Sequence, residues 1–135
     1  MTTKIDALKG MTEEMTKELT GRGISTATEL LELVTTPAQR KSLADAAGVA
    51  QDVVREIANR ADLSRVKGVS GVFSDLLEHA GVDTVKELAT RRADNLHAKI
   101  KEVNDSLNLA GRIPTRADVE SWVEQAKKLP KTLTY

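Results

Sequence analysis

The sequence repeats itself at a fixed shift of 58 residues. Lys9-Gly10-Met11-Thr12 aligns with Lys67-Gly68-Val69-Ser70, and Gly23-Ile24-Ser25-Thr26 aligns with Gly81-Val82-Asp83-Thr84, with no gap between the two matches. Self-similarity at a constant period indicates duplication of one structural unit. We therefore expect two units with a shared fold, residues 1–62 and 63–135.

Hydrophobic periodicity and cap residues predict an all-α fold with about five helices in each unit. In the first unit the predicted helices are 3–9, 12–21, 26–34, 37–47 and 50–61. In the second unit they are 62–67, 71–80, 84–91, 93–107 and 115–129. No run of strand length alternates between apolar and polar residues, so no sheet is expected.

Three of the predicted helices begin at a capping box, in which a Thr side chain and a Glu or Gln three residues later satisfy each other's backbone N–H groups. These are Thr26-x-x-Glu29, Thr84-x-x-Glu87 and Thr36-Pro37-x-Gln39. Apolar residues at helical spacing predict the buried faces. They are Val53, Val54, Ile57 and Ala61, then Leu96, Ile100, Val103 and Leu107, and finally Val119, Trp122, Val123 and Ala126.

The composition excludes several classes of protein. Lys plus Arg and Asp plus Glu number 20 each, so no net charge draws the whole chain toward nucleic acid or an anionic membrane. The absence of cysteine excludes disulfides and thiolate sites and fits a reducing cytoplasm. No signal peptide or membrane span is predicted, so we expect a cytoplasmic protein with no membrane partner. Three aromatic residues are too few for a protein that stacks single-stranded bases.

Five turns share one pattern, a glycine followed by an apolar residue and a small residue between two amphipathic helices. They begin at Gly10, Gly23, Gly48, Gly68 and Gly81. In a helix-hairpin-helix turn the glycine adopts the positive φ that closes the turn, the apolar residue fills the gap between the helices, and a small polar residue caps the second helix. The pattern therefore predicts helix-hairpin-helix turns.

The sequence resembles the helix-hairpin-helix superfamily and, more closely, a bacterial family of tandem helix-hairpin-helix proteins known only as a domain of unknown function. The resemblance lies in residues 62–71, 76–89 and 122–130. It implies that hairpin N–H groups at the start of a helix hold phosphate oxygens, as in the DNA-binding members of the superfamily. Those members usually carry a second glycine after the apolar residue, where this chain has Thr12, Ala50 and Ser70.

The two copies are unequal as phosphate sites. Glu13 and Glu14 follow the first turn and would repel a phosphate, whereas Gly71 follows Ser70 in the second copy. Residues 1–62 hold 8 basic and 10 acidic side chains, and residues 63–135 hold 12 and 10, so the balance is −2 against +2. We expect any nucleic-acid site in the second unit. Its candidate residues are Arg65, Lys67, Gly68, Val69, Ser70, Gly71, Arg112 and Arg116.

No residue pattern indicates catalysis, a cofactor or a small-molecule substrate, so the chain is not expected to be an enzyme. His79 and His97 lack further ligands at metal-binding spacing. Arg91-Arg92 and Lys127-Lys128 fall at predicted helix C-termini, where cations stabilise the helix dipole, and are interpreted as structural.

Two functions stay open at this point. One is sequence-independent binding of duplex DNA or structured RNA by the hairpins of the second unit. The other is a protein interaction or scaffold module that binds no nucleic acid. The neutral charge and the missing second glycines favour the interaction module, whereas the resemblance to DNA-binding members and the basic residues of the second copy favour nucleic acid, which we prefer slightly.

Overall fold

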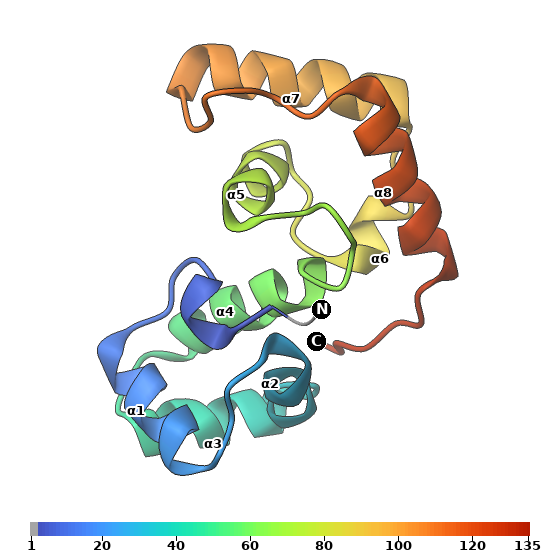
Figure 1. Ribbon diagram of the computed structural model, residues 1–135. Helices are drawn as coiled ribbons and strands as arrows, with labels where there is room; N and C mark the ends of the chain where they lie inside the picture. Colours follow the sequence, from blue (N-terminus) through green and yellow to red (C-terminus); the bar gives the residue numbers. More distant parts are fainter. Residues whose placement is uncertain (1–2) are drawn as a thin grey trace. The chain divides into compact units, whose positions relative to one another are not determined.

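The computed structural model describes residues 3–135 of the chain, and within them it is all-helical, as predicted (Figure 1). The helices are η1 (Ile5–Ala7), α1 (Glu13–Gly21), α2 (Ala27–Leu33), α3 (Pro37–Ala47), α4 (Gln51–Leu63), α5 (Gly71–His79), α6 (Val85–Leu88), α7 (Ala93–Leu107) and α8 (Arg116–Lys128). The described residues form no strand, and one isolated antiparallel bridge joins Lys4 to Thr26.

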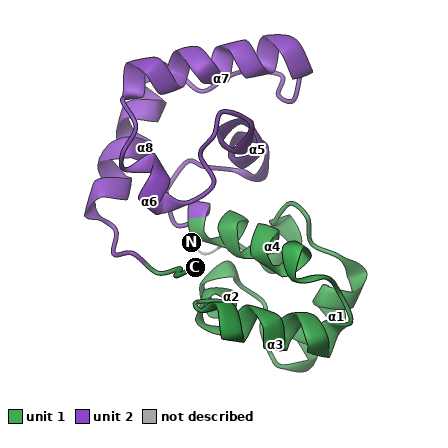
Figure 2. Ribbon diagram, turned by 180° about the vertical axis from the view of Figure 1, so that it is seen from behind, with its two compact units in different colours: residues 1–62, 132–135 green, residues 63–131 purple. Residues whose placement is uncertain are grey.

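The chain divides into two compact units (Figure 2). Residues 1–62 together with 132–135 make the first unit, and residues 63–131 make the second. The last four residues therefore pack with the first unit, although the sequence places them after the second.

Each unit has its own apolar core. In the first, α1 and α2 pack against α3, and the buried side chains include Met15, Leu30 and Ile57. In the second, α7 packs against α5 and α8, and α6 also packs against α8. Trp122 and Ile100 lie in this second core. Burial of these apolar stripes supplies most of the stability of such short helices.

Hydrogen bonds that close the turns recur at the 58-residue shift. The N–H of Ile24 donates to the Leu19 carbonyl at 2.9 Å, and the N–H of Val82 donates to the Leu77 carbonyl at 2.8 Å. The same shift relates the bond from Met11 to Leu8 and the bond from Val69 to Val66, and the N-caps Thr12 and Ser70. All five glycines of the predicted turns have a positive φ, as expected. The two segments thus share one local backbone geometry.

The last long helix of each unit follows the same pattern at a shift of 65 residues, because the segment 108–115 makes the second copy longer. Both α4 and α8 have 13 residues. Residues Val54, Ile57, Ala58 and Ala61 of α4 correspond to Val119, Trp122, Val123 and Ala126 of α8, and all eight are buried.

Several predictions about these elements are wrong. The predicted helix 84–91 is helical only over Val85–Leu88, and the predicted helix 3–9 forms only the 3₁₀ turn Ile5–Ala7. No separate helix covers 62–67, because α4 continues to Leu63 and the following residues form turns. At Thr84 only the first half of the capping box is formed: its hydroxyl accepts from the N–H of Glu87, while the Glu87 carboxylate accepts from Arg91. Leu107 is 50% exposed, because α7 extends past the core at its C-terminal end.

Candidate functional site

The turn before α5 brings together most of the residues predicted as a phosphate site. The N–H of Val66 donates to the Leu63 carbonyl and that of Val69 to the Val66 carbonyl, so the chain turns tightly after α4. Val69 is buried in the core of the second unit, which fits its predicted role as the apolar plug. Ser70 then caps α5, since its Oγ accepts from the N–H of Phe73 at 3.2 Å.

Side chains of helix α8 hold the backbone of this turn in place. The Gln125 amide accepts from the N–H of Lys67 at 2.8 Å and donates to the Lys67 carbonyl at 3.2 Å. Gly68 has a φ of +96°, and a Cβ placed on it would lie 3.0 Å from Nε1 of Trp122. The backbone at Lys67 and Gly68 is thus held in place, while the Lys67 residue is exposed.

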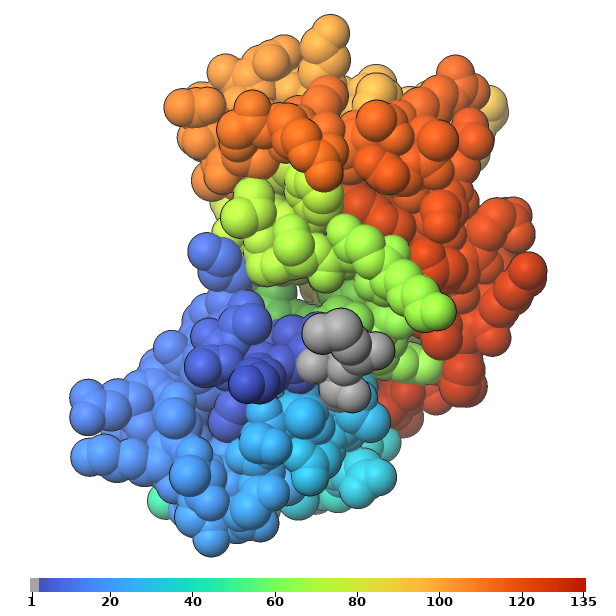
Figure 3. Space-filling view, in the orientation of Figure 1, coloured from blue at the N-terminus to red at the C-terminus, as the bar shows by residue number. Residues whose placement is uncertain are grey.

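Arg112, in the segment between α7 and α8, contacts Phe73 in the first turn of α5. Its guanidinium carbon lies 5.5 Å from the centre of the Phe73 ring, and the Phe73 and Trp122 ring centres are also 5.5 Å apart. A guanidinium held over an aromatic ring by a cation–π interaction can still donate N–H groups to an anion. In Figure 3 the yellow-green atoms of α5 and the turn before it border the orange atoms of the segment 108–115.

The segment that carries Arg112 is anchored at both ends. The Asn104 amide donates to the Ala110 carbonyl at 3.1 Å and accepts from the Ala110 N–H at 2.9 Å. Near the other end, Nε2 of His97 lies 3.1 Å from the Pro114 carbonyl, and Thr115 forms a capping box with Asp118. The N–H of Thr115, then its hydroxyl, and also the charge of Arg112 hold the pKa of Asp118 below its ordinary value.

The first turn of α5 is free of acidic residues. Within residues 3–135 the N–H groups of Gly71 and Val72 have no hydrogen-bond acceptor, and Val72 is 37% exposed. The first N–H groups of a helix carry a partial positive charge that attracts anions. The matching turn of the first unit differs, because Glu13 and Glu14 are exposed there in the first turn of α1.

Two predicted site residues are engaged elsewhere. Nη2 of Arg65 donates to the Pro130 carbonyl at 2.6 Å, so this side chain ties the turn to the segment after α8. Nε of Arg116 pairs with Oε1 of Glu120 at 3.3 Å, and both side chains line a separate cleft. The structure therefore gathers Lys67, Ser70, Gly71 and Arg112 around α5, together with Gly68 and Val69, without Arg65 or Arg116.

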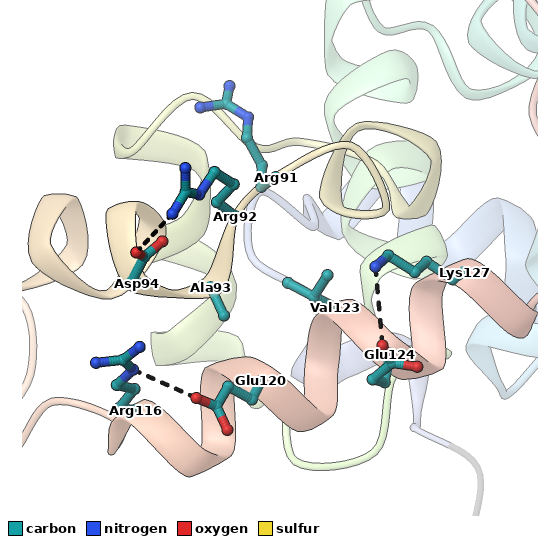
Figure 4. A pocket seen from close by; sticks show the side chains of 9 residues that line it. All are labelled: Arg91, Arg92, Ala93, Asp94, Arg116, Glu120, Val123, Glu124 and Lys127. Atoms are coloured by element: carbon teal, nitrogen blue, oxygen red, sulfur yellow. Dashed lines mark hydrogen bonds and ion pairs between the residues drawn. The ribbon is translucent and has the colours of Figure 1, made fainter.

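The separate cleft has a volume of about 500 Å³ (Figure 4). It is lined by Arg91, Arg92, Ala93, Asp94, Arg116, Glu120, Val123, Glu124 and Lys127. Arg92 pairs with Asp94 at 3.1 Å and Lys127 with Glu124 at 3.7 Å. The N–H of Asn95, followed by Arg92, holds the pKa of Asp94 below its ordinary value. The cleft is therefore mixed in charge.

Sequence reasoning missed this cleft because its residues come from two distant segments. Arg91 and Arg92 were expected at a helix C-terminus, but α6 ends at Leu88. Arg91 instead pairs with Glu87 at 2.9 Å and donates to the Gly81 carbonyl, also at 2.9 Å. Lys127 and Lys128 do lie in the last turn of α8, as predicted.

Residues 3–135 contain no group of three or more His, Asp or Glu side chains placed to hold a metal ion. The same part of the chain contains no helix with the length and apolar character needed to cross a membrane.

Comparison with known families identifies the family of the chain. The family described as Domain of unknown function (DUF4332) matches residues 9–129. The chain belongs to this family. The DUF4332 match begins at Lys9, directly before the first turn glycine, and ends just after α8, so it includes the turn before α5 and the segment that carries Arg112. No curated protein and no solved structure matches the chain.

Proposed function

We propose that this protein binds the phosphate backbone of duplex DNA or structured RNA through the first turn of α5, without reading base sequence. The observation that carries the proposal is the position of Arg112. Its guanidinium lies over the ring of Phe73, whose own N–H is capped by Ser70, so a cation stands beside the first turn of α5, which contains no acidic residue. We interpret the two units as duplicated helix-hairpin-helix units, of which only the second has kept a phosphate site.

Two kinds of donor meet at this turn. The N–H groups of Gly71 and Val72 offer directional hydrogen bonds to phosphate oxygens, and the guanidinium of Arg112 offers a charge-assisted pair of donors. Lys67 adds a second, exposed cation. These groups recognise phosphate and cannot distinguish base pairs, because sequence is read from base edges in the grooves. The role is binding, and no catalytic step is assigned.

The first unit supplies the contrast that supports this assignment. Its corresponding turn has the same cap, with Thr12 accepting from the N–H of Met15 at 3.1 Å. Glu13 and Glu14 place two carboxylates at that helix start, where they already satisfy the helix dipole. The first unit is therefore assigned a structural role and no part in phosphate binding.

Fluorescence anisotropy with two labelled duplexes of unrelated sequence, over a salt series, tests the proposal. With two cationic side chains in contact with phosphate, the slope of log K against log salt is expected to be about −2. Both duplexes should bind equally. Lys67→Glu should weaken binding about tenfold. The matched control is Lys9→Glu, at the residue before the corresponding glycine of the first unit, which should change binding less than about twofold.

A second candidate function is docking of another protein, which the balanced charge of the cleft beside α8 favours. The same experiment separates the two functions. Absence of binding at low salt and micromolar protein would remove the nucleic-acid proposal and leave docking. Equal losses from the two Lys variants would contradict the placement of the site at α5.

A further inference from the structure

Residues Thr132–Tyr135 are held by the first unit, although the whole second unit separates them from it in the sequence. Leu133 is 4% exposed and belongs to the core of the first unit. The N–H of Thr134 donates to the Thr35 carbonyl at 2.9 Å, and the Thr134 hydroxyl donates to the same oxygen at 3.1 Å. The segment is extended and forms no helix.

A buried arginine, Arg40, binds the backbone of this segment. Arg40 on α3 is 6% exposed. Its Nη1 donates to the carbonyls of Val34 at 2.8 Å and Thr35 at 3.2 Å, and its Nη2 donates to the Thr134 carbonyl at 2.5 Å. A buried cation is costly unless its donors are satisfied. Because one of these acceptors is the Thr134 carbonyl, all three hydrogen bonds of the Arg40 guanidinium form only when an extended peptide occupies the site.

The aromatic ring of Tyr135 is recognised separately. Arg40 and Arg55 lie 4.8 and 4.9 Å from its centre, and its hydroxyl donates to Oδ1 of the buried Asn59. A cleft of about 240 Å³ adjoins the ring and is lined by Pro37, Arg40, Gln51, Asp52, Arg55 and Tyr135 itself. Tyr135 as a whole is 58% exposed, so recognition of its ring rests on the two arginines and on the bond to Asn59 rather than on burial.

We propose that the first unit is a peptide-binding site for an extended segment with the pattern leucine, any residue, tyrosine, and that Thr132–Tyr135 fills it in cis. The backbone bonds to Thr35 and Arg40 provide affinity for any extended peptide. The pocket for Leu133 and the two arginines around Tyr135 provide specificity, as in other sites where main-chain pairing is combined with side-chain pockets. The same segment supplied in trans can take the place of the tail.

The test uses the full chain with Leu133→Asp, which removes the tail from the apolar core, and an amidated, fluorescein-labelled peptide of residues 129–135. The peptide is expected to bind this variant saturably and to raise its melting temperature. It should bind the unaltered chain at least about tenfold more weakly, because the tail in cis competes at a high effective concentration. A peptide with alanine in place of the tyrosine should lose about tenfold in affinity.

A folding control and a second variant ensure that a negative result can be interpreted. Circular dichroism, together with NMR amide signals of first-unit residues such as Ile57, establishes that the first unit of the Leu133→Asp chain is folded. Where it is not, Thr134→Pro takes its place, since proline removes the N–H that donates to Thr35. Failure of the peptide to bind a folded variant, or equal binding of the tyrosine and alanine peptides, would overturn the proposal.

Discussion

At the scale of single residues, Gly68 is constrained twice. Its φ of +96° is a conformation that costs other residues about 1–2 kcal/mol, and a Cβ added there would meet Nε1 of Trp122. Gly10, the corresponding residue of the first unit, likewise faces Ile57, since a Cβ added to it would lie 4.0 Å from Cγ1 of that side chain. Ile57 and Trp122 correspond at the 65-residue shift, but the contact in the first unit is looser, and the atom nearest to a Cβ on Gly10 is Cγ of Glu56 at 3.2 Å.

Gly68→Ala is expected to lower the free energy of unfolding by about 2–4 kcal/mol, because backbone strain and overpacking against Trp122 add. Gly23→Ala is the matched control. Its φ is +78°, but nothing lies within 4 Å of an added Cβ, so strain alone should cost about 1 kcal/mol. Urea unfolding followed by circular dichroism measures both values. Equal losses would show that the Trp122 contact has no energetic role.

Glu29 shows how a cap responds to pH. The N–H of Ser25 and then the Thr26 hydroxyl donate to its carboxylate, and these bonds hold its pKa below the ordinary value of 4.5. Because the pKa is lower in the folded state, the stabilisation is present above pH 4.5 and is lost as the pH falls through the lowered pKa. Carbon-detected NMR titration of the Glu29 carboxyl should give a midpoint below 4.5.

Thr26→Ala should move that midpoint part of the way back, because the Ser25 N–H still donates. A midpoint for Glu29 at or above the ordinary glutamate value in the unaltered chain would contradict the capping box.

At the scale of elements, most helices could be predicted because their signals are local. Thr26 and Thr36 begin α2 and α3 through capping boxes, as the sequence predicts. The errors lie in local details as well: α6 ends at Leu88, and the Glu87 carboxylate accepts from Arg91 in place of completing the capping box. The placement of Arg112 over Phe73 could not be predicted, because it depends on how the segment 108–115 folds back onto α5.

A substitution at Asn104 tests the role of the segment that places Arg112 over Phe73. Asn104→Ala removes both hydrogen bonds to Ala110 and loosens the segment that carries Arg112, without changing any charge. Nucleic-acid affinity is expected to fall about threefold to tenfold, while the salt slope stays near −2 because the same cations still contact phosphate. Anisotropy over a salt series measures both quantities. A changed slope with unchanged affinity at low salt would contradict a positioning role.

At the scale of the whole molecule, the neutral chain consists of two units of opposite charge. The first carries 8 basic and 10 acidic side chains and the second 12 and 10, since Thr132–Tyr135 contain no charged residue. The 58-residue repeat predicts two units but not the return of the tail to the first. Thr134 donates to Thr35, 99 positions away, and accepts from Arg40, 94 positions away, and no local pattern encodes such long-range bonds.

Phosphate binding at α5 is tested most directly by observing its backbone amides during titration with a short duplex, in nitrogen-edited NMR spectra of the full chain. The amide signals of Gly71 and Val72 are expected to shift strongly and saturate together, with the Arg112 side-chain signal. The amides of Glu13 and Glu14, at the corresponding turn of the first unit, should stay in place. Shifts at Glu13 and Glu14 equal to those at Gly71 and Val72, or shifts confined to the cleft beside α8, would contradict phosphate binding at α5.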